Sequence, residues 1–310
     1  MTDYAQTNTS IKPGLWCLAR DAAVAGQRAV ATALHSDEPG ESHSMAGHIG
    51  SAHLSIDVIA HQAVERFVYS AYDGHVQVVG EEVRRSLWTP VGGLVVTVDP
   101  VDGTGPALDL GFGWSTVVLV HRLARVSNNG RSGWRLVGAA IADCCGNIMS
   151  FVRPNVVLIS TAIDGRGKVA RVRPSRSSGS VALVGAKSSS RRNWTETVGG
   201  LTGTAYNLGG TPTAWGLLTG RLGASVIASP TTHWDAAQVL LASQAGAVVM
   251  DLESGARVAS ATVIEWFSTP EFEDGTGGAH IRPCVVAVDN DAAVSVAGAS
   301  RTTADSAVTK

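Results

Sequence analysis

Two carboxylates three residues apart, directly after an apolar run, are the most chemically suggestive feature of this 310-residue sequence. The run 94–98 is largely apolar and β-branched, which indicates a buried strand, and it ends at Asp99 and Asp102. Unpaired charges beside a buried strand are costly, whereas carboxylate and carbonyl oxygens are the ligands that Mg²⁺ takes. Pro100 stiffens the turn, so both carboxylates and the carbonyl of Val101 can converge on one cation.

The neighbours of this pair favour a metal site over the alternative, which is an ordinary polar turn. Thr104 or Gly105 can cap a helix that begins at Pro106. A helix N-terminus is a ready site for phosphate, so metal ligands beside it indicate phosphoryl chemistry. Upstream, Glu81 follows the predicted strand 76–79. Because it comes one connection before the aspartate pair, we interpret it as a bridging metal ligand rather than a solvated acid.

Composition and charge narrow the class of protein. The formal net charge is −2 and the isoelectric point is near 6.5, which gives no electrostatic case for nucleic acid or an anionic membrane as partner. A hydrophobic content of 45% with 16% charged residues is typical of a globular chain. The four cysteines form no CxxC pattern, which favours free thiols in a reducing cytoplasm. We find no apolar run typical of a signal peptide or a membrane span, and therefore expect a cytoplasmic protein.

Apolar periodicity predicts the elements that must position these acids. Helical spacing and turn signals place helices over 13–34, 57–72, 211–218 and 233–245. Strands are predicted over 115–121, 134–142 and 148–152, as an antiparallel meander, and then over 181–184, 224–227 and 247–250. This mixture of helices and strands indicates the α/β (α+β) class.

A basic, Ser- and Gly-rich stretch runs over 165–192, and its first part, 165–180, is the best candidate boundary between two halves of the chain. We place an N-terminal α+β half at 13–175, a C-terminal α/β half at 176–297 and a disordered tail at 298–310. The basic side chains are interpreted as a solvated linker rather than as a patch that steers anions.

Three short boxes, taken in order, resemble the inositol monophosphatase and fructose-1,6-bisphosphatase superfamily, a family of Mg²⁺-dependent, lithium-sensitive phosphatases. Asp99-Pro-Val-Asp-Gly-Thr104 resembles its metal-binding signature, and Gly80-Glu81-Glu82 precedes it as the family pattern requires. Trp234-Asp235-Ala236-Ala237 resembles the third box, at a helix start. Asp57 corresponds to a helix-capping aspartate of the family, and Gly210-Thr211 to its small-residue turn.

The resemblance implies a layered αβαβα sandwich of the sugar-phosphatase type and Mg²⁺-dependent hydrolysis of a phosphate monoester. Thr104, paired with Asp57, would orient the attacking water, and Glu81 completes the catalytic set. Backbone N–H groups of Gly103 and Thr104 would hold the phosphate oxygens. Two or three Mg²⁺ ions would be held by five groups, namely Glu81, Asp99, the carbonyl of Val101, Asp102 and Asp235.

The substrate side departs from the family pattern. Inositol-type members carry a glutamate seven or eight residues before the aspartate of the third box, where this sequence has Ile227 and Ala228. Together with Gly210 and Thr211, these are the predicted substrate-binding residues. The expected substrate is a small phosphorylated polyol, sugar or nucleotide, and the substitution disfavours inositol monophosphate itself.

Several alternatives stay open at this point. Within the phosphatases they are a fructose-1,6-bisphosphatase and a 3′-phosphoadenosine or nucleotide phosphatase, including one that serves specialised-metabolite biosynthesis. From another class, the chain could be a non-catalytic relative that binds a phosphorylated ligand. The resemblance also implies a homodimer.

Overall fold

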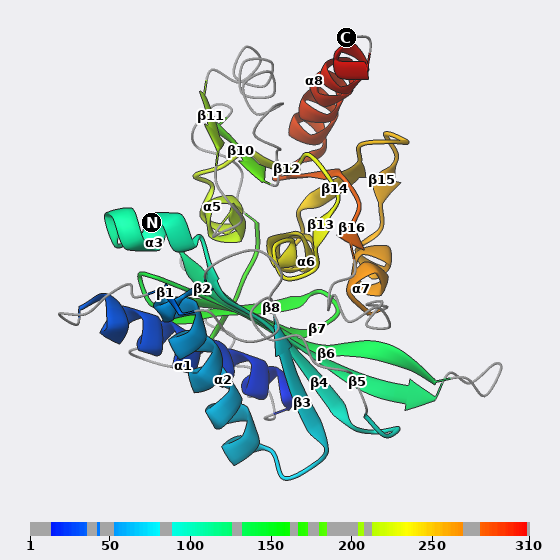
Figure 1. The fold of residues 1–310 in the computed structure, drawn as a ribbon. Helices are drawn as coiled ribbons and strands as arrows, with labels where there is room; N and C mark the ends of the chain where they lie inside the picture. The colour runs from blue at the N-terminus through cyan, green and yellow to red at the C-terminus, as the bar shows by residue number, and fades with distance from the viewer. Residues whose placement is uncertain are drawn as a thin grey trace, which may run out of the picture.

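The computed structural model describes residues 14–35, 42–43, 53–80, 89–125, 132–161, 167–172, 180–184, 204–207, 213–268 and 280–308. Over these residues, helices and sheets alternate in five layers, from a helical layer through two sheets with helices between them to an outer helix (Figure 1). The predicted αβαβα sandwich is confirmed. Among the described residues, no helix combines the length and the apolar character needed to cross a membrane.

The N-terminal half is built on a sheet whose described strands run in the order β3-β4-β5-β6-β7-β8-β9. β3 and β4 pair in parallel, and the strands from β4 onward pair antiparallel in sequence order, which confirms the predicted meander. The strands are β3 (Val76–Gly80), β4 (Leu94–Asp102), β5 (Ser115–Arg125), β6 (Ser132–Asp143), β7 (Asn147–Arg153), β8 (Val156–Thr161) and β9 (Lys168–Val169). The remaining elements of this half are α1 (Leu15–Leu34), α2 (Ser55–Ala71), α3 (Thr104–Leu110) and the short pair β1 (Ser42–His43) and β2 (His53–Leu54).

Small residues let α1 and α2 pack very closely on this sheet. A Cβ atom at Gly26 of α1 would lie 2.7 Å from Cγ2 of Thr116 and 2.9 Å from Cγ2 of Val64. In β6, a Cβ atom at Gly138 would lie 2.9 Å from the carbonyl oxygen of Leu15. Neither position has room for a side chain, so the helix layer is held tightly against β5 and β6.

The C-terminal half is built on a second sheet with the order β11-β10-β12-β17-β14-β15. Its strands are β10 (Ser180–Val184), β11 (Thr204–Asn207), β12 (Ala224–Ile227), β14 (Val248–Asp251), β15 (Arg257–Val258) and β17 (Cys284–Ala287), and a separate ladder joins β13 (Thr231–Thr232) to β16 (His280–Ile281). The helices α5 (Thr213–Thr219), α6 (Ala237–Gln244) and α7 (Ser260–Ser268) lie between the two sheets, and α8 (Asn290–Val308) covers the outer face (Figure 1).

The two halves share one apolar core. A single cluster of buried side chains joins Leu119 of β5 to Leu240 of α6 and Val286 of β17. Every residue of α6 is buried, as expected for a helix enclosed between two sheets. The predicted boundary between 13–175 and 176–297 falls outside the described residues and stays a prediction.

The expected disordered tail at 298–310 is wrong as far as Val308, because α8 continues to that residue. Ala293, Val296 and Ala297 pack against the second sheet, and Ser300 is 1% exposed. The Ser300 hydroxyl donates to the carbonyl of Val296 at 2.7 Å. Among the described side chains of the tail, Ser300 is buried four residues after Val296, and composition alone does not reveal that the buried face of α8 continues there.

Candidate metal centre

A backbone irregularity near the end of β4 places Asp99 and Asp102 together. All nine residues of β4 are buried, so the strand continues through the segment that the sequence predicted to be a turn. Residues three apart in a regular strand point to opposite faces. Here the pairing with β5 shifts between Asp99 and Asp102, and the hydroxyl of Thr116 donates to the carbonyl of Pro100 at 2.8 Å. This bulge lets both carboxylates reach the same space.

The third carboxylate, Asp235, comes from the C-terminal half. It lies in the turn between β13 and α6, where Thr231 donates its hydroxyl to Oδ2 of Asp235 at 3.1 Å. The backbone N–H of Asp235 points back to the Thr232 hydroxyl oxygen at 3.4 Å. The helix predicted to open at 233 therefore begins only at Ala237, because residues 233–236 form the turn that presents Asp235.

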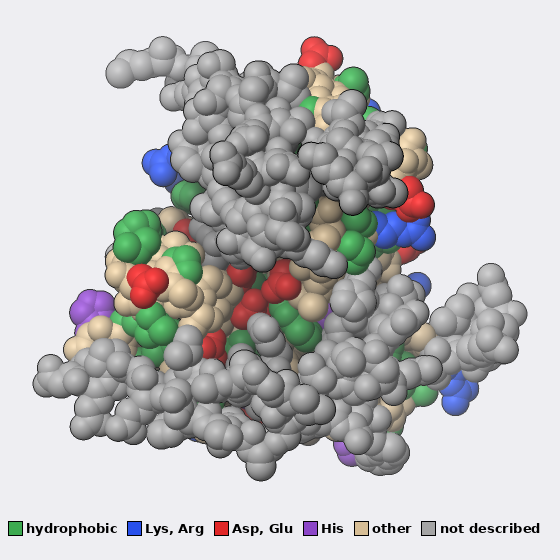
Figure 2. Space-filling view, turned by 45° about the horizontal axis from the view of Figure 1, so that its top comes forward, with side chains coloured by type: hydrophobic (Ala, Val, Ile, Leu, Met, Phe, Trp, Pro, Cys, Tyr) green, Lys and Arg blue, Asp and Glu red, His purple; other side chains and the backbone are tan. Residues whose placement is uncertain are grey.

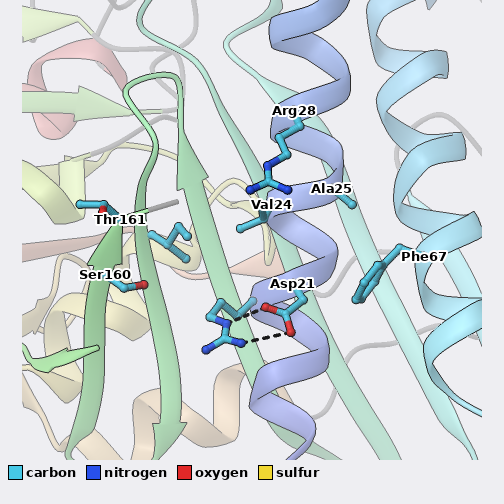
Figure 3. Close-up of a pocket in the computed structure, with 9 residues that line it drawn as sticks. Asp21, Val24, Ala25, Arg28, Phe67, Ser160 and Thr161 are labelled. Atoms are coloured by element: carbon cyan, nitrogen blue, oxygen red, sulfur yellow. Dashed lines mark hydrogen bonds and ion pairs between the residues drawn. The ribbon is translucent and has the colours of Figure 1, made fainter. Parts of the chain in front are cut away.

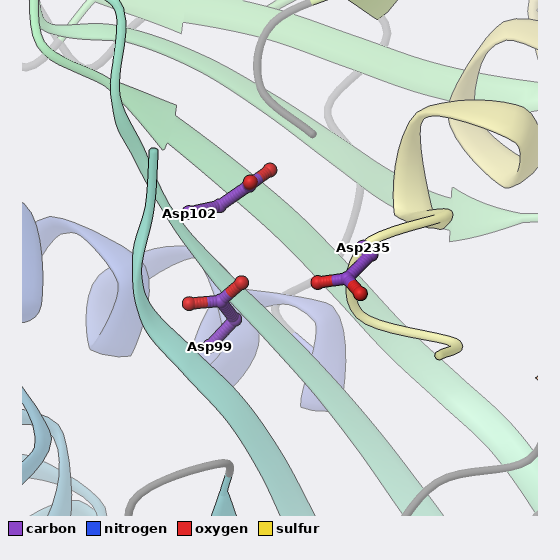
Figure 4. Close-up of side chains that lie close together, drawn as sticks. All are labelled: Asp99, Asp102 and Asp235. Atoms are coloured by element: carbon purple, nitrogen blue, oxygen red, sulfur yellow. The ribbon is translucent and has the colours of Figure 1, made fainter. Parts of the chain in front are cut away.

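The three carboxyl groups converge at the junction of the two halves. One oxygen from each of Asp99, Asp102 and Asp235 lies within 4.8 Å of the other two, and the groups point into one space (Figure 4). In the space-filling view, acidic side chains gather at the centre of the visible face, between the halves (Figure 2). This confirms that the sequence boxes around Asp99 and Asp235 meet in space.

The electrostatics of the cluster fit a hard cation. Burial raises the pKa of Asp235, and smaller contributions from hydrogen bonds with Thr232, Thr231 and Asp99 lower it. Three carboxylates in one buried place repel each other as anions, and a divalent cation removes that repulsion. Oxygen donors of this kind suit Mg²⁺, and the carbonyl of Val101 in the same bulge can add a fourth. The residues present therefore fit the metal that the sequence predicts.

Thr104 and Asp57 lie beside this cluster as a hydrogen-bonded pair. The Thr104 hydroxyl is 3.1 Å from Oδ1 of Asp57 and 2.9 Å from the carbonyl oxygen of Val101, so its one proton has two acceptors. Asp57 lies in the first turn of α2 and is 5% exposed. The predicted pairing of Thr104 with Asp57 is present in the structure.

The predicted cap of the following helix is wrong in detail. The helix α3 begins at Thr104, and the cap position is Gly103, with φ of 96° and no side-chain cap. Only glycine adopts this left-handed conformation without strain. The Thr104 side chain is therefore engaged with Asp57 and Val101 rather than with the helix end, and Pro106 lies in the first turn.

The other predicted site residues are placed as follows. Glu81, Gly210 and Thr211 lie outside the described residues. Ile227 is fully buried in the shared apolar core, so its side chain does not contact solvent. Ala228 is partly exposed, and its backbone N–H donates to the carbonyl of Val184 at 3.1 Å. Of the Ile227–Ala228 pair, only Ala228 is open to a ligand.

The sequence analysis missed a set of buried polar side chains behind the cluster. Nε2 of His233 lies 2.9 Å from the hydroxyl oxygen of Thr97. The rings of His233 and His121 meet edge to face with centroids 5.8 Å apart, and Nε2 of His121 lies 2.8 Å from the carbonyl oxygen of Phe267. Burial lowers the pKa of His121 to about 4 and that of His233 well below its ordinary value. Thr97, the one polar residue in the apolar run 94–98, was the available signal.

A separate surface hollow of 330 Å³ lies along α1, away from the carboxylates (Figure 3). Its wall includes Arg20 and Asp21, which form a two-point ion pair with N–O distances of 2.7 and 3.1 Å. Arg28 of α1 and Ser160 of β8 also line it. None of its lining residues belongs to the acidic cluster.

The two sheets, with helices between and outside them, have the same fold as solved inositol monophosphatase structures. An inositol monophosphatase from Thermotoga maritima superposes with a TM-score of 0.62 and 15% identity, over 92% of this chain and 98% of that one. The extragenic suppressor protein SuhB of Bartonella henselae gives 0.64 and 13%, over 92% and 97%. An inositol monophosphatase/NADP phosphatase, solved with Mg²⁺ and phosphate, gives 0.55 and 14%, over 84% and 85%.

These likenesses confirm the predicted resemblance at the level of the fold. Searches with protein-family models and among curated proteins find no match to this sequence.

Proposed function

We propose that this protein is a Mg²⁺-dependent phosphate monoesterase that acts on a small phosphorylated polyol, sugar or nucleotide. The observation that carries the proposal is the convergence of Asp99, Asp102 and Asp235 from two halves of the chain to within 4.8 Å. The Thr104–Asp57 pair beside them adds a way to hold a water. A structure of the same fold, solved with Mg²⁺ and phosphate, supports the choice of metal and substrate class.

The proposed metal ligands are the three clustered aspartates, the Val101 carbonyl and Glu81, and together they would hold two or three Mg²⁺ ions. Bound Mg²⁺ supplies Lewis-acid chemistry, which lowers the pKa of water and neutralises charge on the phosphate oxygens. Burial of Asp99 and Asp102 favours such binding, because solvent screens their charge less than it would at the surface. The backbone N–H groups of Gly103 and Thr104 would hold the remaining phosphate oxygens.

The Thr104 hydroxyl would orient the attacking water. When it donates its proton to Asp57 or to the Val101 carbonyl, the lone pairs of its oxygen remain free to accept a hydrogen bond from water. The water oxygen then attacks phosphorus in line, the bond between phosphorus and the ester oxygen breaks, and a proton from the water ends on the leaving alcohol. The products are the alcohol and inorganic phosphate, and no side chain forms a covalent intermediate.

The substrate proposal rests on Ala228, with Gly210 and Thr211 as further contacts. An alanine cannot accept a hydrogen bond from a sugar hydroxyl, which favours a less hydroxylated leaving group than inositol. Fructose 1,6-bisphosphate and 3′-phosphoadenosine nucleotides stay within this proposal, and so does NADP, which a neighbour of the same fold is named for. A cytoplasmic homodimer is also part of the proposal.

The test is phosphate release by the purified protein over a panel of sugar phosphates, inositol phosphates and nucleotides, with Mg²⁺ or with a chelator. We expect Mg²⁺-dependent release of phosphate by the wild type and by Asp73→Asn. This variant changes an exposed aspartate outside the cluster and is the matched control for Asp99→Asn. Release that survives chelation would contradict the proposal. Mg²⁺ and phosphate-ester binding without any turnover would instead favour the non-catalytic relative.

A further inference from the structure

We propose that the buried hydrogen bond between Thr97 and His233 positions Asp99 against Asp235 and so sets the metal affinity of the centre. Thr97 and His233 are positioning residues here, because neither belongs to the carboxylate cluster. The role given to the metal rests on the proposed function, whereas the geometric part of the inference does not.

The hydrogen bond joins equivalent positions on the two halves of the cluster. Thr97 stands two residues before Asp99 on β4, and His233 stands two residues before Asp235 in the turn that follows β13. Residues two apart on a strand share a face, so Thr97 and Asp99 both face the C-terminal half. The 2.9 Å contact between Nε2 of His233 and the Thr97 hydroxyl therefore fixes the two chain segments immediately beside the carboxylates.

Such a constraint is needed because the packing around it is not directional. The halves meet through a largely apolar core, and apolar contacts favour burial without fixing one exact relative placement. Asp99 and Asp235 meanwhile repel each other whenever both are ionised. A fully buried polar pair is costly unless its hydrogen bond is made. The relative placement of the two halves in which Thr97 and His233 meet is therefore favoured over neighbouring placements.

The imidazole of His233 also contacts two other rings. Trp234 lies against it with ring centroids 4.7 Å apart, and His121 meets it edge to face at 5.8 Å. A carbonyl oxygen can only accept, so His121 donates its Nε2 proton to Phe267 at the end of α7. The connection thus runs from β4 through His233 and His121 to α7, across the junction of the halves.

The first test measures metal binding directly, by calorimetric titration with Mg²⁺ and with Mn²⁺ as a second probe. Thr97→Val keeps the shape of the side chain and removes the hydroxyl, whereas Thr97→Ser keeps the hydroxyl. We expect Thr97→Val to weaken Mg²⁺ binding by roughly tenfold, the lower end of what partners behind metal ligands contribute, and Thr97→Ser to bind like the wild type. The control is Ser150→Ala, which removes a buried hydroxyl from β7 of the same sheet.

Activity adds a second readout that a general loss of packing would not reproduce. Thr97→Val should need more Mg²⁺ for half-maximal phosphate release, with kcat and the substrate KM close to wild type once Mg²⁺ saturates. A variant with a lower melting temperature but unchanged Mg²⁺ affinity would show that the hydrogen bond is merely structural and would overturn the inference. If Thr97→Val does not fold, His233→Phe, which keeps an aromatic ring and removes the nitrogen that contacts Thr97, replaces it.

A double-mutant cycle in chelator tests the geometric part without metal or substrate. Asp99→Asn relieves carboxylate repulsion and should raise the melting temperature of the metal-free wild type. In the Thr97→Val background the same change should raise it less, because the carboxylates are already free to separate. Equal increases in melting temperature in the two backgrounds would overturn the inference. A chain that shows the coupling and the Mg²⁺ effect but releases no phosphate would contradict only the proposed function.

Discussion

The hydroxyl oxygen of Thr104 lies 3.1 Å from Oδ1 of Asp57, although 47 residues separate the two along the chain. The contact links the first residue of α3 to the first turn of α2, directly beside the Asp99–Asp102 bulge. Since the Thr104 hydroxyl proton has two acceptors, Asp57 and the Val101 carbonyl, the Thr104 oxygen is oriented before any substrate arrives. Oriented groups of this kind need no reorganisation at the moment of reaction.

Removal of this hydroxyl should therefore lower the rate rather than the affinity. We expect Thr104→Ala to reduce kcat by about 10²-fold or more, as other groups that act in the transition state do, with little change in KM. Thr104→Ser keeps the hydroxyl and is the matched control. Steady-state kinetics at saturating Mg²⁺ measure both constants. A near-normal kcat in Thr104→Ala would mean that the water is held in another way.

Neutralising one carboxylate should separate metal binding from folding. In Asp99→Asn we expect Mg²⁺-dependent turnover to disappear while the fold remains, because the amide no longer supplies an anionic ligand. In chelator, the variant should melt at a higher temperature than the wild type, since the three clustered carboxylates repel one another. Added Mg²⁺ should then stabilise the wild type but not the variant. Undiminished activity in Asp99→Asn would refute the site assignment.

Much of this site could be predicted from sequence because its acidic residues occur in short local motifs. The carboxylates lie in two boxes whose order along the chain fits one fold, and apolar periodicity located α1, α2 and the meander. Periodicity does not predict which side chains meet across the two halves. Thr97 and His233 are 136 residues apart, and neither position is unusual by itself.

Two local errors have a common physical cause. The bulge at Asp99 and Asp102 remains part of β4, and the cap of α3 is Gly103 rather than Thr104. In both places a contact with a residue distant in sequence accompanies the departure from the local pattern. The Thr116 hydroxyl donates to the carbonyl of Pro100 in the bulge, and the Thr104 hydroxyl lies 3.1 Å from Oδ1 of Asp57, so tertiary contacts override the local pattern.

Selectivity among phosphate esters should follow from the alanine at position 228. A site without a hydrogen-bond partner discriminates weakly for a hydroxyl, whereas a site with one can discriminate by orders of magnitude. We expect inositol 1-phosphate to give a lower kcat/KM than at least one sugar phosphate or nucleotide. Ala228→Glu should raise the relative kcat/KM for inositol 1-phosphate, and Ala228→Leu should not. If inositol 1-phosphate is the best substrate of the wild type, residues other than Ala228 bind the ring hydroxyls.

Stability should fall in mild acid because of buried neutral histidines. Burial lowers the pKa of His121 from 6.5 to about 4, so between these values the unfolded chain takes up a proton that the folded chain does not. The free energy of unfolding therefore decreases as pH falls through this window, by about 1.4 kcal/mol per pH unit for one such group. His233 acts in the same direction, whereas Asp235, whose pKa is raised, acts in the opposite one.

The contribution of His121 to the pH dependence of stability can be isolated by comparing the wild type with a variant. His121→Gln removes the titrating group and leaves an amide N–H that can donate to the carbonyl of Phe267. Urea unfolding of both metal-free proteins at several pH values between 4 and 7 gives the slope of unfolding free energy against pH for each protein. The His233 and Asp235 contributions are present in both proteins and largely cancel in the difference between the two slopes. We expect the variant to lose less stability per pH unit below 6.5, so the two curves should converge towards pH 4. Parallel curves would mean that His121 takes up a proton in the folded protein as readily as in the unfolded chain, despite its burial.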